Sequence, residues 1–105
     1  MALQYFAYLY IAPGFHPDNH TTVVESDACK IKTIGMDVSL KERSIDLCKI
    51  LVKNNVQLIE LCGGFGPLWV AKINEAIDSK IPVASVMHGP ETRQAMLELL
   101  RPKSP

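Results

Sequence analysis

The run Leu58–Trp69 constrains the fold of this chain more than any other stretch, because it joins an apolar segment to a glycine-rich turn and a proline. Residues 56–61 are mostly apolar and β-forming, which predicts a strand that is covered on both faces of a sheet. The glycines that follow can turn the backbone sharply because they have no Cβ, and Pro67 suits the first turn of a helix. The run therefore predicts a strand, a tight turn and the start of a helix.

A strand that leads through glycines into a helix is a favourable setting for a bound anion. Free backbone N–H groups and the positive end of the helix dipole would both face a ligand beside the carboxyl end of the strand. The spacing differs from a dinucleotide-binding fingerprint, and the run lacks the Lys-Ser/Thr pair of a phosphate-binding P-loop. The alternative is a structural turn that holds no ligand.

Four strands and three helices are predicted from the spacing of apolar residues and from boundary signals. The predicted strands are 3–11, 29–36, 56–61 and 83–87, and the predicted helices are 39–54, 67–79 and 90–100. Ser39 and Glu42 have the spacing of a capping box at the first helix. The second strand carries alternating lysines, which suits an edge strand. The connection 15–27 is left open, with a short helix over residues 17–25 as one option.

Strands that alternate with helices predict right-handed crossovers and a parallel sheet. We therefore expect an α/β fold in which residues 1–105 form a single domain. Its core would be a small open, mainly parallel four-stranded sheet, in the order 2-1-3-4, with helices on both faces. In this order the turns 12–16, 62–67 and 87–90 meet at the carboxyl ends of the strands, where open α/β sheets bind ligands.

Charge and cysteine content narrow the class of partner and the compartment. Eleven basic and 11 acidic side chains give a formal net charge of zero, which argues against a nucleic acid or an anionic membrane as a partner. Residues 1–11 are apolar but lack a basic leader region and are too short to span a bilayer, so we interpret them as a strand rather than a signal peptide. Three cysteines without a C-x-x-C pair indicate free thiols in a reducing cytoplasm.

Three residues are candidates for catalysis. Cys62 ends the third predicted strand beside a helix start, a position that favours a nucleophilic thiolate. His88 ends the fourth strand and would act as the base for Cys62, or as a donor to a bound anion. Glu60 is a carboxylate inside an apolar strand, which would suit an acid or a base. The structural alternatives are a buried thiol for Cys62, a turn hydrogen bond for His88, and an ion pair or a dimer contact for Glu60.

The candidates for ligand binding gather around the predicted turns. Glycines would supply backbone donors, a histidine would orient the ligand, and two aromatic rings would form an apolar wall. These candidates are His16, Gly63, Gly64, Phe65, Gly66, Trp69 and Gly89. Alternatively, Phe65 and Trp69 would be covered by a second copy in a homodimer. We expect no metal site, because no paired ligand spacing lies on a predicted helix, and the pattern identifies no cofactor.

The central run resembles the signature of a family of short bacterial α/β proteins classed as a domain of unknown function. The motif that carries the resemblance is LIELCGGFGP-x-W, supported by the opening segment Tyr8–Gly14 and by the strand that begins at Pro82. The resemblance covers most of the chain and implies a stand-alone α/β protein. It implies no catalytic residue, because none is known for that family.

Three functions remain open at this point. The preferred hypothesis is a cytoplasmic protein that binds a small, anionic metabolite at the carboxyl ends of its strands. The second is an enzyme that acts on a small molecule with Cys62 as nucleophile and His88 or Glu60 as base. The third is a non-catalytic homodimeric assembly module. The lack of an acid, base and nucleophile at a defined spacing favours binding over catalysis.

Overall fold

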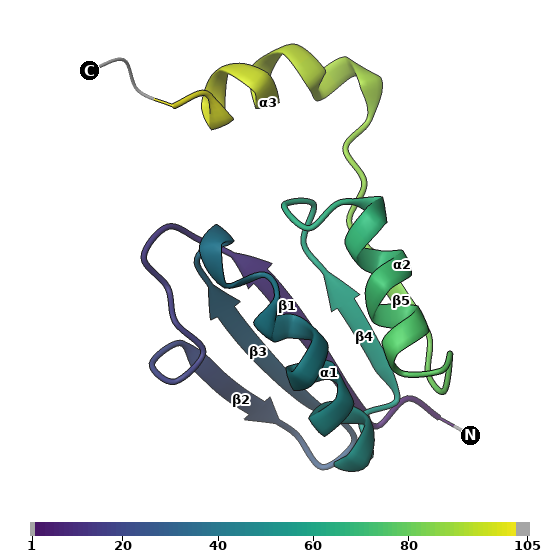
Figure 1. Ribbon diagram of the computed structural model, residues 1–105. Helices are drawn as coiled ribbons and strands as arrows, with labels where there is room; N and C mark the ends of the chain where they lie inside the picture. The colour runs from purple at the N-terminus through teal and green to yellow at the C-terminus, as the bar shows by residue number, and fades with distance from the viewer. Residues whose placement is uncertain (1, 103–105) are drawn as a thin grey trace.

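The computed structural model describes residues 2–102 and shows an α/β fold built on a five-stranded sheet (Figure 1). The strands are β1 (Tyr5–Ile11), β2 (Thr21–Glu25), β3 (Lys30–Met36), β4 (Leu58–Leu61) and β5 (Val83–Ser85). The α-helices are α1 (Arg43–Lys53), α2 (Pro67–Ala76) and α3 (Arg93–Leu100), and the 3₁₀ helices are η1 (Val38–Leu40) and η2 (Pro90–Thr92). No helix of the described residues is long and apolar enough to cross a membrane.

Strand β1 lies at the centre of the sheet and runs parallel to both β3 and β4. Strand β5 extends the parallel part of the sheet beyond β4. The full order is β2-β3-β1-β4-β5, so the predicted order of the four parallel strands is confirmed. The carboxyl ends of β1, β4 and β5 therefore meet at one edge of the sheet.

The connection between β1 and β3 contains a fifth strand, which we did not predict. Strand β2 pairs antiparallel with β3 and makes the sheet mixed. The option of a short helix over residues 17–25 is therefore wrong, and β3 is an inner strand rather than an edge strand. One reason is local, because Thr21–Val24 is a run of four β-branched residues, which lose side-chain freedom in a helix and fit a pleated strand. The other is the free edge of β3, with which these residues pair.

One face of the sheet is covered by α1 and α2, which lie side by side and contact one another (Figure 1). Both helices belong to connections that run in the same direction across the sheet, and right-handed crossovers then place them on the same face. Apolar side chains fill the layer between helices and sheet. The buried core consists of Ala7, Leu9, Ile34, Met36, Cys48, Leu51, Val56, Ile59, Leu61, Phe65, Ile73 and Ile77.

The opposite face of the sheet carries no helix among residues 2–102, so the expectation of helices on both faces is wrong. The connection from β1 to β3 would have supplied a helix there, but it forms β2 instead. Helix α3 stands away from the sheet, beyond the end of β4 and β5 (Figure 1). Strand alternation puts a second set of side chains on this uncovered face, which we call the open face. It is formed by Phe6, Tyr8, Tyr10, Ile31, Thr33, Leu58 and Glu60.

Helix α1 begins later than predicted, because Asp37 organises the chain before it. The Asp37 carboxylate accepts hydrogen bonds from the backbone N–H groups of Gly14 at 2.8 Å and of Ser39 at 3.0 Å. These bonds lower the pKa of Asp37 to about 2. The predicted capping box of Ser39 and Glu42 does not form, since η1 occupies this stretch and α1 starts at Arg43 without a side-chain cap.

Candidate functional site

A hollow lies at the carboxyl ends of β4 and β5. The backbone N–H of Val86 donates to the carbonyl of Leu61 at 2.9 Å, which holds the segment after β5 against the end of β4. The hollow has a volume of about 350 Å³. Its walls are the turn after β4, the start of α2 and the segment after β5, through Gly63, Gly66, Pro67, Ser85, Val86, Met87 and His88. We call this hollow the turn site.

The turn after β4 enters α2 through Gly66. The φ angle of Gly66 is 79°, in the left-handed region that favours glycine. Gly66 is the N-cap of α2, and Pro67 follows it at the first turn, but no side chain caps this helix start. The first N–H groups of a helix have no partner within the helix, and the helix dipole adds a positive potential around them. Pro67 has no N–H, and the N–H of Val70 donates to the Gly66 carbonyl at 3.3 Å. The N–H groups of Leu68 and Trp69 therefore remain as donors at the start of α2, next to Gly66 and Pro67 at the border of the turn site.

His88 places its imidazole ring directly against the backbone of Gly63. A Cβ atom at Gly63 would lie 2.7 Å from Cε1 and 2.9 Å from Nε2 of the ring. Both distances are well below van der Waals contact, so the ring can take this position only because residue 63 is glycine. The two residues come from neighbouring strand ends, and both border the turn site.

Gly64 and Gly89 are closely packed but do not line the turn site. A Cβ atom at Gly64 would lie 3.1 Å from Cβ of Ile11, so this glycine lets the turn approach the end of β1. A Cβ atom at Gly89 would meet the carboxylate of Glu91, which is the movable end of a side chain. Both predicted ligand-binding glycines therefore have a packing explanation.

Cys62 is bonded to β1 rather than to a candidate base. Its backbone N–H donates to the carbonyl of Leu9 at 2.9 Å. Its Sγ accepts a hydrogen bond from the N–H of Ile11 at 3.2 Å. Within residues 2–102, no hydrogen bond joins this sulfur to His88 or to Glu60. The predicted nucleophile and its predicted bases are therefore not assembled into a hydrogen-bonded set.

Glu60 lies on the open face and does not line the turn site. It is opposite Tyr8 in the register of β1 and β4, and both residues are half-buried. Burial raises the pKa of Tyr8, and the negative charges of ionised Cys62 and Glu60 raise it further. We did not predict that Tyr8 lies beside Glu60. The available signal was strand alternation, which puts residues 8 and 60 on the same face of the sheet.

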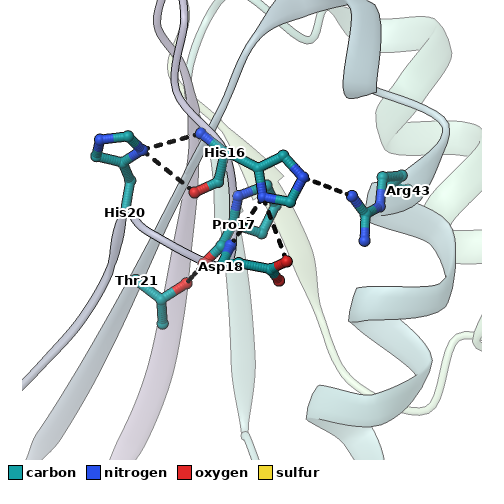
Figure 2. A network of polar contacts seen from close by, with 6 residues as sticks. All are labelled: His16, Pro17, Asp18, His20, Thr21 and Arg43. Carbon is teal, nitrogen blue, oxygen red and sulfur yellow. Dashed lines mark hydrogen bonds and ion pairs between the residues drawn. The ribbon is translucent and has the colours of Figure 1, made fainter.

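His16 belongs to a separate polar network at the start of the β1–β2 connection (Figure 2). Its Nε2 lies 2.9 Å from Nη1 of Arg43. A guanidinium can only donate, so Nε2 is the acceptor. The other ring nitrogen, Nδ1, lies 3.1 Å from the backbone nitrogen of Asp18 and 3.6 Å from Oδ2 of the same residue. None of these three residues lines the turn site, so His16 and His88 do not converge on it.

His20 and Thr21 complete this network and fix the entry into β2 (Figure 2). The N–H of His16 donates to Nδ1 of His20 at 2.9 Å, and the Thr21 hydroxyl donates to the Pro17 carbonyl at 2.6 Å. The His20 ring stacks on Phe15 with ring centroids 4.1 Å apart. The network therefore has a clear structural role, which is to hold the loop before β2.

The two aromatic residues beside the glycines have different environments. Phe65 is only 3% exposed and belongs to the core, so the expectation that it forms a surface wall is wrong. The physical reason is that the tight turn directs this ring inward, into the core cluster. Trp69 is half-buried, and the ammonium of Lys72 lies 4.6 Å from the centroid of its ring. Neither ring lines the turn site.

A second hollow, which the sequence analysis missed, lies between α1 and α2 at the other edge of the sheet. Its volume is about 220 Å³. Three lysines stand around it, and lysines near helix ends were the available signal. The lining residues are Lys49, Val52, Lys53, Ala76, Ile77, Asp78 and Lys80. This lysine hollow is a competing position for an anion.

Metal-binding side chains do not gather in the described part of the chain. No group of three or more histidine, cysteine, aspartate or glutamate side chains there could hold a metal ion. Cys29, Cys48 and Cys62 are free thiols. Burial raises the pKa of the Cys48 thiol to about 12, which keeps it protonated and unreactive.

Comparison with known families matches residues 4–101 to a family described as "Family of unknown function (DUF6506)". No curated protein and no solved structure shows a significant similarity to the chain.

Proposed function

Since the chain belongs to DUF6506, a family of unknown function, we propose a function from its own geometry: it binds a small anionic molecule in the turn site. The backbone N–H groups at the start of α2 would donate to the anion, and His88 would donate from the side of β5. The volume of about 350 Å³ is at the small end of the range for ligand pockets, which fits a small metabolite better than a nucleotide.

The observation that carries this proposal is the contact between His88 and Gly63. The ring lies against a residue that has no side chain, at the border of a hollow that also meets the uncapped start of α2. A histidine in this position has a ring nitrogen available for a ligand. The positive end of a helix dipole favours a negative charge on that ligand.

Catalysis by Cys62 has less support than binding. The Sγ atom already accepts a hydrogen bond from the N–H of Ile11, and Glu60 lies on the open face. An activated nucleophile needs a base within hydrogen-bonding reach, and His88 contacts Gly63 instead. We therefore do not assign a reaction to this protein.

The setting in which we propose this binding function follows from charge and cysteine content. Three free thiols suit a reducing compartment such as the cytoplasm. Eleven basic and 11 acidic side chains leave no excess positive charge for a nucleic acid. We therefore propose a small molecule as the ligand.

Isothermal titration calorimetry with inorganic phosphate tests the proposed function. Wild-type protein should bind phosphate saturably, and His88→Ala should weaken binding roughly 10- to 100-fold, because a hydrogen bond to a charged group contributes about 1.5–3 kcal/mol. Lys53→Ala is the matched control, since it removes a polar group from the lysine hollow. The proposal is wrong if Lys53→Ala abolishes binding while His88→Ala leaves it unchanged, or if the wild type binds no phosphate.

A further inference from the structure

Helix α3 is amphipathic, but it does not pack onto the sheet formed by the described residues. None of its residues is buried, and its main contacts are with η2, the 3₁₀ helix directly before it. The radius of gyration is 14.7 Å, whereas a compact chain of this length has about 13 Å. Figure 1 shows the cause, because α3 projects away from the rest of the fold.

The apolar side chains of α3 form a defined stripe. Met96, Leu97 and Leu100 are spaced to lie on one side of a helix, and Arg93 stands one turn before them. These four residues line one shallow hollow together with His88 and Gly89. Leu97 is 58% exposed and Leu100 is 70% exposed. We call these four residues the α3 stripe.

The open face of the sheet is the complementary surface in the same chain. Three aromatic rings run along β1, and Tyr8 and Tyr10 stack with centroids 6.1 Å apart. The Tyr10 ring lies directly over Gly35, where a Cβ atom would be 2.6 Å from it. The part of the face along β1 is therefore aromatic. Glu60 is the one charged residue of the open face as we define it, so its charge is opposite to that of Arg93.

The chain between β5 and α3 directs the helix away from its own open face. Val86 is bonded to β4, and the His88 ring is seated on Gly63, so the start of this segment is fixed on the sheet. Gly89 is extended, with φ −67° and ψ 157°, and Pro90 then begins η2. Proline and the extended residue before it restrict the backbone. With this geometry α3 projects beyond the carboxyl ends of β4 and β5 and does not lie on the open face of its own sheet (Figure 1).

We propose that a second copy of this chain completes the fold, with α3 of each protomer lying on the open face of its partner. The arrangement is an isologous two-fold dimer in which each copy gives one helix and receives one. The α3 stripe would cover the aromatic rings of β1, and Arg93 would pair with Glu60. Because the contact occurs twice, it removes two uncovered apolar surfaces per protomer from water.

The oligomeric state of α3 variants gives the first test, by size-exclusion chromatography with light scattering at micromolar concentration. We expect the wild type to be a dimer, and Leu97→Glu to be a folded monomer, because α3 contributes nothing to the core. Leu99→Glu is the matched control, since Leu99 is exposed on the same helix but does not line the stripe, and it should remain dimeric. A monomeric wild type, or a dimer that tolerates Leu97→Glu, would overturn the proposal.

A charge-exchange experiment separates helix exchange from a helix that folds back on its own sheet. Glu60→Lys and Arg93→Glu each place like charges together, so each variant alone should dimerise less well than the wild type. An equimolar mixture restores opposite charges at both contacts of a mixed dimer, and we expect dimer to reappear. A fold-back helix meets only its own chain, so mixing would then change nothing, and that result would refute the exchange.

Discussion

Gly63→Ala is the most informative single change in the turn site, because its effect can be worked out from one contact. The added Cβ would lie 2.7 Å from Cε1 and 2.9 Å from Nε2 of His88. Ordinary contacts of this kind are 3.4–4 Å, so the ring has to move by roughly 1 Å or turn away. Overpacking of this kind costs about 1–3 kcal/mol. We expect a value near the lower end, because the exposed His88 side chain can move.

The effect on binding should be larger than the effect on folding. If His88 donates to the ligand, its displacement loses most of a hydrogen bond worth about 1.5–3 kcal/mol, or roughly 10- to 100-fold in Kd. Calorimetry with phosphate measures the change in Kd, and urea denaturation measures the change in the free energy of unfolding.

The double variant Gly63→Ala/His88→Ala provides the control for this reasoning. Removing the ring removes the clash, so the double variant should be about as stable as His88→Ala alone, while phosphate binding stays weak. The coupling of two contacting residues is what a double-mutant cycle measures. Unchanged phosphate affinity in Gly63→Ala, or stability losses that simply add, would contradict the assigned contact.

Three further predictions test the fold around the site. Ile59→Ala should lower the free energy of unfolding, measured by urea denaturation, by about 2–5 kcal/mol, because Ile59 is fully buried. The control Ile50→Ala, at an exposed position of α1, should change it by less than about 0.5 kcal/mol. Equal losses in the two variants would contradict the placement of Ile59 in the core. The pKa of Asp37 is lowered from 3.8 to about 2, so its ionised form stabilises the fold above pH 3.8, and this stabilisation is lost as the pH falls towards 2. In thermal melts between these pH values, Asp37→Asn should show a weaker pH dependence than the wild type. Identical profiles would contradict the capping role of Asp37. Cys48 is buried and its pKa is raised to about 12, so iodoacetamide should modify it only after unfolding. Peptide mapping that finds Cys48 alkylated in the native protein would refute its buried position.

The four parallel strands could be predicted because their sequence signals agree with their surroundings. The run Val56–Leu61 is apolar and β-forming, and its core side chains Ile59 and Leu61 are fully buried. The glycines and Pro67 after it set the turn and the start of α2 where we expected them. Short-range chemistry and tertiary packing favour the same structure in this part of the chain.

The errors arise where tertiary context decides between two local options. Residues 17–25 had a helical spacing of apolar residues, but their β-branched side chains and a free edge of β3 favour a strand. Asp37 could cap the chain ahead of Ser39 because Gly14 approaches from another loop and donates to the same carboxylate. A contact between residues 14 and 37 has no signal in a single sequence.

Part of the candidate site could be predicted from the order of the strands. Strand order put His88 beside the glycine turn, and the contact with Gly63 agrees with this. His16 was expected nearby because it also follows a strand, but Arg43 and Asp18 hold it in a separate network (Figure 2). Phe65 points into the core rather than to the surface, since the direction of a side chain within a tight turn depends on φ and ψ values that composition does not reveal.

The most direct test of the central claim is a titration of ¹⁵N-labelled protein with inorganic phosphate, followed by amide chemical shifts. Binding at the turn site should produce saturable shifts at the amides of Gly63, Gly66, Leu68 and Trp69, and the His88 ring signals should move at the same phosphate concentrations. Shifts confined to Lys49, Lys53 and Lys80 would instead assign the anion to the lysine hollow. Those shifts, or none at all, would contradict the proposed function.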